Sequence, residues 1–388
     1  MTPRVAWPGE ARNSMAAPAP IESLTGIRYL AAAAVLMYHF VPADHSLGWL
    51  FRDGWLGVPF FFTLSGAVLA YSYLPTFLDG EGISWRRFLA LRLVRIYPCY
   101  LLAFIIALVP FVQSQVRATA SLEAAAVRIA GGAAMYLSLM QSWLTTPWTS
   151  GVVISPAWSL SCEWFFYVLF CPLLLLLRPL LKHGGMAVGL AFMATCISVV
   201  GLVVAEQFLT AHYPTGIRGF WNDYFWRGPF ANFPYFLGGI FVGRLLHLSA
   251  DRAGTPAAVA TYAGIACLLL LFSGLGTEVS DTLKRTAVLP VSAAVILGLA
   301  AAHTTAARVL GTPVFSMLGE ASYPLYLLQL PLNDVLASAL PPPGIVGGAV
   351  RLVCFTVISV LVAILVERPT RRLLRDLLLG GAKKPASR

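Results

Sequence analysis

Long apolar segments recur along almost the whole chain, and short polar stretches separate them. Ten of these segments are long and apolar enough to cross a lipid bilayer as a helix. They are residues 26–42, 54–74, 94–113, 154–177, 186–206, 228–247, 256–275, 286–302, 313–338 and 345–366. Because lipid offers the backbone no hydrogen-bond partners, segments of this kind fold as helices. The pattern therefore predicts an all-α, polytopic helical membrane protein with about ten transmembrane helices.

Another apolar segment, residues 122–143, is interrupted by Arg128, Gly131 and Gly132. The basic residues of the other loops decide its placement, since Lys and Arg gather on the cytosolic side of membrane proteins. With the N-terminus inside, the loops richest in Lys and Arg all lie inside, but only if this segment does not cross completely. We therefore expect a re-entrant or interfacial helix here, both termini in the cytosol, and the chain in a bacterial inner membrane.

The composition fits this class of protein. Of the 388 residues, 58% are hydrophobic and 11% are charged, whereas a soluble domain carries about 25% charged residues. This excludes an ordinary cytosolic enzyme. The net charge of +10 is expected to face anionic lipid headgroups, and no nucleic-acid partner is expected. Three regions are predicted: a flexible cytosolic leader (1–21), a membrane domain (22–370) and a basic cytosolic tail (371–388).

No metal ion and no bound cofactor are expected. The six cysteines lie in apolar segments and form neither a CxxC pair nor the Cys/His spacing of a metal site. The chain also lacks a phosphate-binding P-loop, a GxSxG elbow, an HExxH zinc motif and a dinucleotide fingerprint. Nucleotide hydrolysis, zinc chemistry and hydride transfer are therefore not supported.

The first apolar segment carries two ionisable residues, Arg28 and His39. On a helix, this spacing places them on one face to within roughly 20° and about 16 Å apart along the axis. Ionisable groups within a span are costly, so each is a candidate functional residue. The small side chains of residues 31–34 between them let a second helix or a thin ligand approach. The alternative is a snorkelling arginine and a hydrogen-bonded core histidine.

A second cluster contains Arg92 and Arg95, which are neighbours on one helix face near the predicted inner boundary. The guanidinium fork matches phosphate oxygens, so the pair is a candidate site for an anionic donor. The alternative is a basic anchor with no role beyond fixing the helix in the membrane.

A third cluster places Ser159, Glu163 and Tyr167 four residues apart, on one face of a helix. We expect Glu163 in the outer half of the membrane, near the depth of His39. A carboxylate at that depth needs a partner or a proton, and either is useful for catalysis. The alternative is a structural glutamate paired with an arginine or a tyrosine.

Five motifs follow one another along the chain. They read S-L-x-G-I-R-x10-H up to His39, G-W-L-G-V-x-F-F-F-T-L-S-G up to Gly66, R-R-F ahead of R-x-x-R-I-Y-P up to Pro98, W-S-L-x-x-E-x-x-F-Y up to Tyr167, and L-G-x-x-S-Y-x-x-Y-L up to Leu327. In this order they resemble the acyltransferase-3 family of integral membrane acyltransferases. The resemblance covers about residues 20–370.

The resemblance implies an enzyme that moves an acyl group, usually acetyl from acetyl-CoA, to a hydroxyl of a glycan, a lipid-linked sugar or a small metabolite. It implies Arg28 and His39 as the essential pair, with Arg92 and Arg95 on the donor side. The family's tyrosine block often ends in His, where this chain has Gln329. No proton-transfer role is therefore assigned to that position.

We expect acyl-CoA to dock from the cytosol, with its phosphates held by Arg92, Arg95 and Arg28. His39 then acts as general base on the acceptor hydroxyl, or carries the acyl group as a nucleophile. Glu163 or Asp44 is expected to orient the imidazole. The candidate acceptor-binding residues, which are aromatic or hydroxyl-bearing, are Trp158, Tyr167, Ser322 and Tyr323.

Two other functions stay open. A proton-coupled transporter or flippase of a glycan or lipid would use Arg28, His39 and Glu163 as a proton relay. A structural membrane subunit of a glycan-assembly complex would leave the same residues inert. Both explain intramembrane charges, but they explain the paired arginines and the ordered motifs less well.

Overall fold

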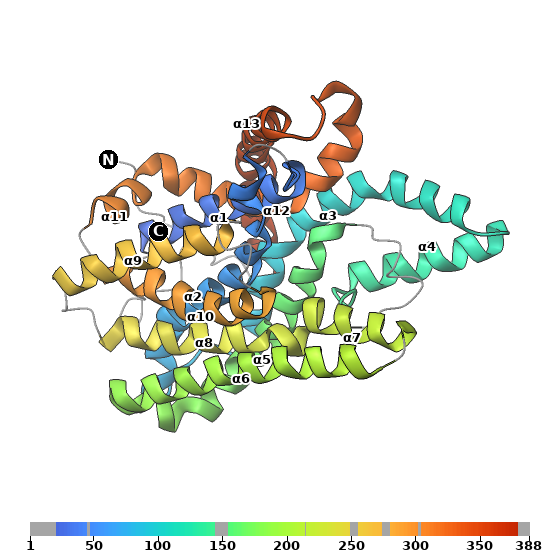
Figure 1. Ribbon diagram of the computed structural model, residues 1–388. Coiled ribbons are helices and arrows are strands. Elements are labelled where there is room, and N and C mark those ends of the chain that lie inside the picture. The colour runs from blue at the N-terminus through green and yellow to red at the C-terminus, as the bar shows by residue number, and fades with distance from the viewer. Residues whose placement is uncertain are drawn as a thin grey trace, which may run out of the picture.

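The computed structural model describes residues 21–44, 47–143, 154–213, 215–248, 255–273, 280–301 and 304–378, and every regular element in these ranges is helical (Figure 1). The α-helices are α1 (Glu22–Phe40), α2 (Gly57–Asp79), α3 (Trp85–Ala118), α4 (Leu122–Leu137), α5 (Trp158–Lys182), α6 (Gly185–His212), α7 (Thr215–Arg227), α8 (Pro229–Leu248), α9 (Thr255–Phe272), α10 (Asp281–Ala301), α11 (Thr305–Leu310), α12 (Pro313–Leu336), α13 (Ile345–Val362) and α14 (Arg368–Leu378). Short 3-10 turns are η1 (Gly48–Phe51), η2 (Gly54–Leu56), η3 (Ser155–Ala157) and η5 (Ala337–Ala339), and η6 (Ala363–Glu367) is a π-helical turn.

Glycines bring the central helices into backbone contact. A Cβ added at Gly239 of α8 would lie 2.1 Å from the carbonyl oxygen of Thr63 on α2. A Cβ at Gly319 of α12 would lie 2.0 Å from the carbonyl oxygen of Thr25 on α1. Small residues at such crossings are a common basis of helix association in membranes. The first motif-bearing helix, α1, is thereby held tightly against the helix that carries the last motif, α12.

Six helical segments of the described chain are long and apolar enough to span a membrane. They are Gly48–Asp79, Trp85–Ala118, Ser155–Lys182, Gly185–His212, Asp281–Ala300 and Ile345–Leu377. The expected number of about ten spans is therefore not confirmed. The shortfall includes α1, α8 and α12, whose apolar sequences are interrupted by polar residues such as Arg28, Asn232 and Gln329. A shorter apolar helix, Ala258–Phe272, lies in α9.

Helix α4 runs back along α3 and ends beside its middle. The Tyr100 hydroxyl donates a hydrogen bond to the Tyr136 carbonyl oxygen (2.7 Å), and Tyr97 does the same to Leu137. With its 16 residues, α4 is about 24 Å long at 1.5 Å per residue, less than the ~30 Å of a hydrocarbon core. This length agrees with the expectation that segment 122–143 does not cross on its own.

Helix α5 begins inside the bundle. The Ser161 hydroxyl donates to the Leu139 carbonyl oxygen (2.6 Å), and the Gln141 side-chain amide donates to the Ala157 carbonyl oxygen (2.6 Å). These residues are buried. The chain after α4 therefore meets the start of α5 within the protein.

The predicted leader lies almost wholly outside the described residues, as do the last residues of the predicted tail. The start of that tail is ordered as part of α14, which continues from α13 through η6. The predicted boundary at residue 370 thus falls within a helix.

Candidate functional site

Three partly buried arginines gather near the start of α1: Arg28 on that helix, and Arg92 and Arg95 on α3. Arg92 donates a hydrogen bond to the Tyr73 hydroxyl (3.0 Å), and its guanidinium lies 5.2 Å from the centre of the Phe88 ring. Arg28 and Arg95 form no hydrogen bond with the described residues, although Arg28 interacts electrostatically with both other arginines. Their donors are therefore available to a ligand.

Glu163 on α5 belongs to this arginine cluster. Its Oε1 atom accepts hydrogen bonds from the Ser65 hydroxyl (3.0 Å) and from the Tyr167 hydroxyl, and its charge interacts with Arg28 and Arg95. The spacing of four between Glu163 and Tyr167 does place them together. Glu163 thus contributes one carboxylate beside the three guanidinium groups.

The expected pairing of Glu163 with His39 is not formed in the described part of the chain. The sequence places Glu163 in the outer half because it assumes that α5 starts at the outer surface. The helix instead starts inside the bundle, where the Tyr326 hydroxyl donates to the Pro156 carbonyl oxygen (3.0 Å). Glu163 therefore lies by Arg28, and Arg28 precedes His39 by about 16 Å along the axis of α1.

His39 lies in the last turn of α1, and its side chain is exposed. Its ring neighbours are Tyr38 at 5.1 Å and Phe40 at 6.4 Å between ring centres, and no described residue forms a hydrogen bond with it. The exposed Asp44, beyond Pro42, does not bond to it either. The imidazole is thus open to a reactant, and no described carboxylate fixes its tautomer.

The four candidate acceptor-binding residues do not form one surface. Tyr167 donates to Glu163 and lies beside Arg92. The Ser322 hydroxyl donates to the Gly319 carbonyl oxygen of its own helix (2.6 Å), and the Tyr323 hydroxyl donates to the Ile96 carbonyl oxygen (2.8 Å). Trp158 is half-buried, with its ring 6.1 Å from that of Phe62. Among the four, Trp158 is the one whose polar group no described residue engages.

Several residues that bond within the site were not among the candidate catalytic or binding residues chosen from the sequence. Ser65 and Tyr73 of α2 bond to Glu163 and Arg92, and Tyr326 bonds to Ser159 (2.8 Å). Ser65 and Tyr326 stand within two of the five motifs, so their position in the motifs was the available signal.

The C-terminal end of α1 meets a second charged cluster, which has a different composition. The 3-10 turn η2 packs on this end, since a Cβ at Gly54 would lie 3.0 Å from Cβ of Tyr38. Just before it, Asp53 accepts a hydrogen bond from Lys284 of α10 (2.6 Å) and one from the indole of Trp55 (3.2 Å). Both ions of this pair are buried.

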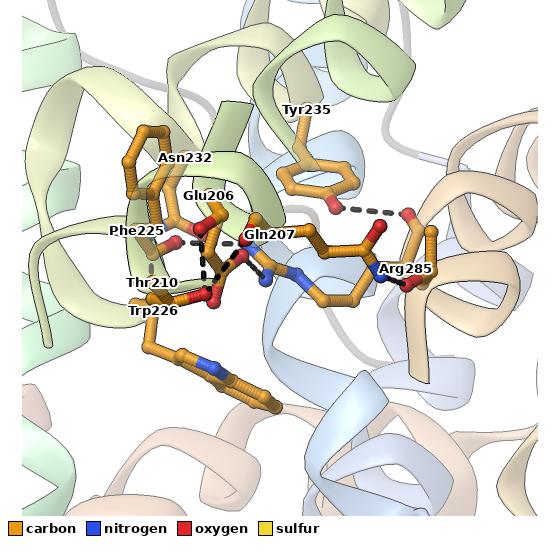
Figure 2. A network of polar contacts seen from close by, with 9 residues as sticks. Glu206, Gln207, Thr210, Phe225, Trp226, Asn232, Tyr235 and Arg285 are labelled. Carbon is orange, nitrogen blue, oxygen red and sulfur yellow. Dashed lines mark hydrogen bonds and ion pairs between the residues drawn. The ribbon is translucent and has the colours of Figure 1, made fainter. Parts of the chain in front are cut away.

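Arg285, the next residue along α10, is the centre of the network in Figure 2. It forms a buried ion pair with Glu206 of α6 and donates to the Phe225 carbonyl oxygen (2.9 Å). Its guanidinium lies 5.0 Å from the centre of the Trp226 ring, and its own carbonyl oxygen accepts from Tyr235 (2.9 Å). One arginine thus joins α6, α7, α8 and α10.

The described residues contain no group of three or more His, Cys, Asp or Glu side chains placed to hold a metal ion.

Comparison with known proteins connects this geometry to an activity. The model of a family described as an acyltransferase domain matches residues 21–368. The chain is similar to an acyltransferase, MdmB, from Streptomyces mycarofaciens, with 30% identity over 330 residues, which is 80% of this chain and 78% of that protein. No solved structure matches the chain. Because the family model matches nearly the whole helical bundle, the chain belongs to the acyltransferase-3 family and is an acyltransferase.

Proposed function

We propose that the protein is a membrane-embedded O-acyltransferase that takes an acyl group, most simply acetyl, from cytosolic acyl-CoA. The acceptor is a hydroxyl of a glycan, a lipid-linked sugar or a small metabolite. The family supports acyl transfer in general. The observation that carries the choice of donor is the arginine cluster, in which three guanidinium groups (Arg28, Arg92 and Arg95) outnumber the carboxylates that interact with them, Glu163 and Glu367.

Uncompensated like charges in a partly buried site are unfavourable unless an anion joins them. The phosphates of acyl-CoA would supply that negative charge, and arginine binds phosphate with paired, charge-assisted hydrogen bonds. Arg28 and Arg95 have no hydrogen-bond partner among the described residues to lose when the donor arrives. Glu163 would then balance and orient the guanidinium groups rather than the imidazole.

The two ends of α1 match the two functional parts of acyl-CoA, its phosphates and its thioester. The alanines of residues 31–34 lie between Arg28 and His39 and leave little side-chain bulk along the helix. With its phosphates at the arginine cluster, the extended pantetheine arm of acyl-CoA could follow α1 and bring the thioester to the exposed His39. The acceptor hydroxyl would enter from the opposite, outer side, with Trp158 available to stack on a sugar ring.

In the reaction proposed here, His39 takes the proton of the acceptor hydroxyl as its oxygen attacks the thioester carbonyl carbon. The carbon–sulfur bond then breaks, and the CoA thiolate leaves and is protonated by the imidazolium. In the variant with a covalent carrier, the His39 nitrogen attacks the thioester carbonyl carbon, the carbon–sulfur bond breaks and the CoA thiolate leaves. The acceptor oxygen then attacks the acyl-imidazole, the carbon–nitrogen bond breaks, and the hydroxyl proton passes through the imidazole to the thiolate. Both routes need an imidazole that is free to meet two substrates in turn.

Radiolabelled acetyl-CoA tests this function with purified protein in nanodiscs. We expect slow release of CoA, or label bound to the protein, in the wild type and its loss in His39→Ala. Donor binding should persist in that variant, because His39 lies far from the arginine cluster. Absence of binding and release with acetyl-CoA and longer acyl-CoA would instead favour a transporter of a glycan or lipid.

Three further expectations belong to this proposal. The protein resides in a bacterial inner membrane, its N- and C-termini face the cytosol, and the arginine cluster opens to that side. The basic residues of the predicted inner loops and tail support this orientation.

A further inference from the structure

A fourth arginine stands beside the arginine cluster, on the last helix of the described chain. Arg371 of α14 interacts electrostatically with Arg95 and Arg92 of α3. The elements that carry it, η6 and α14, both pack against α3. Its side chain is 36% exposed, so it is more open to solvent than a residue of the bundle core. From the sequence alone, Arg371 belongs to a basic tail expected to face lipid headgroups.

A buried carboxylate holds Arg371 in place. An Nη1 atom of Arg371 donates to Oε1 of Glu367 (3.1 Å), and the Glu367 side chain is only 7% exposed. The other carboxylate oxygen, Oε2, is buried and has no hydrogen-bond partner in the described residues. Glu367 also interacts electrostatically with Arg95. It therefore lies between the arginine of the tail helix and the arginine cluster.

The helix is distorted where this carboxylate projects. Residues 363–367 form the π-helical turn η6 between α13 and α14. Single π-helical turns within longer helices are frequent at functional sites. A buried polar atom without a partner likewise calls for an explanation in terms of function or a bound species. Both features mark the same residue, Glu367.

We propose that Arg371 is a further donor-binding residue, which takes the ribose 3′-phosphate of acyl-CoA, and that Glu367 is the residue that positions it. This inference rests on the proposed function. Acyl-CoA carries two separate anionic groups, a pyrophosphate nearer the thioester arm and a 3′-phosphate beyond it. The partly buried cluster of Arg28, Arg92 and Arg95 suits the inner group, and the more exposed Arg371 suits the outer one.

Neighbouring charges on α14 do not compete for this role. Arg368 pairs with Glu320 of α12 (2.7 Å), and both side chains are exposed at the surface. Arg372, the next residue after Arg371, is exposed and has no described ionic partner. It offers a matched control, because it lies on the same helix and carries the same charge.

The test compares two probes, CoA and 3′-dephospho-CoA, which differ only in the phosphate in question. Their affinities are measured by calorimetry with full-length protein in nanodiscs. We expect the wild type to bind CoA about tenfold more tightly than 3′-dephospho-CoA, the effect of a hydrogen bond to a charged group. In Arg371→Ala this preference should vanish while the affinity for 3′-dephospho-CoA stays unchanged, and Arg372→Ala should retain the preference.

The retained binding of 3′-dephospho-CoA shows that the variant is folded. If Arg371→Ala does not fold, Arg371→Gln, which keeps most of the side-chain length, gives the same readout. A wild-type preference that survives in the Arg371 variant overturns the inference and leaves the donor proposal standing. A wild type that binds neither nucleotide overturns both.

Discussion

The charged clusters at the two ends of α1 differ in their balance of positive and negative charge. Near the start of this helix, Arg28, Arg92 and Arg95 outnumber the two carboxylates that interact with them, Glu163 and Glu367. Two of the three guanidinium groups have no described hydrogen-bond partner. Beyond its end, Lys284 pairs with Asp53 and Arg285 pairs with Glu206. The first cluster holds an excess of positive charge, whereas in the second each cation has its own anion.

This difference separates a binding role from a structural one. A buried ion pair whose partners satisfy each other has no charge left for a ligand, and removing one partner strands the other. A cluster with surplus cations is instead complementary to an anion. We therefore assign the cluster near Arg28 to donor binding, and the network around Lys284 and Arg285 to holding four helices and η2 around the exposed His39.

The largest effect is expected from His39, which belongs to neither cluster. Replacing it with Ala should lower acyl transfer by about 10²–10⁴-fold, the usual contribution of a general base, with donor affinity unchanged. Transfer is measured as CoA release per folded protein. Near-normal turnover in this variant would remove His39 from the mechanism.

Substitutions in the network of Lys284 and Arg285 should lower the stability of the protein and leave donor binding unchanged. Arg285→Ala strands the buried Glu206 carboxylate, and we expect a loss of about 3–5 kcal/mol in the free energy of unfolding. Arg227→Ala is the control, because its pair with Asp223 is exposed and is worth at most about 1 kcal/mol. Thermal unfolding in detergent compares the two variants. Equal stability would contradict the structural role.

Substitutions in the cluster of Arg28, Arg92 and Arg95 should weaken donor binding and leave the stability of the protein unchanged. Arg28→Lys keeps the charge but loses the guanidinium fork, so we expect roughly a tenfold higher requirement for acyl-CoA with folding intact. Arg86→Lys, at an exposed position of α3, should behave as the wild type. A donor requirement that is identical in both variants would make Arg28 a structural residue.

The smallest effect on stability is expected from an ion pair that belongs to neither of the two charged clusters. Glu320 and Arg368 form an ion pair between two exposed side chains. Glu320→Gln should change the free energy of unfolding by less than about 1 kcal/mol. A larger loss would show that this exposed ion pair holds α14 against α12, so that a structural role would not be confined to the network of Lys284 and Arg285.

Much of this organisation follows from local sequence. The helical class follows from the apolar pattern, the family from the five ordered motifs, and the contact of Tyr167 with Glu163 from their spacing of four. The expected number of spans is not confirmed, because α1, α8 and α12 carry polar residues within the bundle and do not have the apolar composition of a lipid-facing helix.

Other features depend on contacts between distant segments, which spacing cannot reveal. The position of Glu163 depends on how α5 packs in the bundle, and the start of this helix bonds to Tyr326, which is 170 residues away from its partner Pro156. Asp53 and Lys284 are 231 residues apart in the chain. The sequence supplies such charges but gives no distance between them, so the contrast between the two ends of α1 appears only in the folded chain.

The central claim is that the surplus of positive charge near the start of α1, at Arg28, Arg92 and Arg95, binds the anionic donor. Calorimetry with CoA tests it most directly, with Arg95→Gln and Glu163→Gln compared to the wild type. Each variant replaces a charged side chain with a neutral one, and Gln at 163 retains an oxygen that can accept from Ser65 and Tyr167. The account predicts opposite shifts: at least about tenfold weaker binding in Arg95→Gln and tighter binding in Glu163→Gln. Equal weakening in both variants, or no change in either, would contradict it.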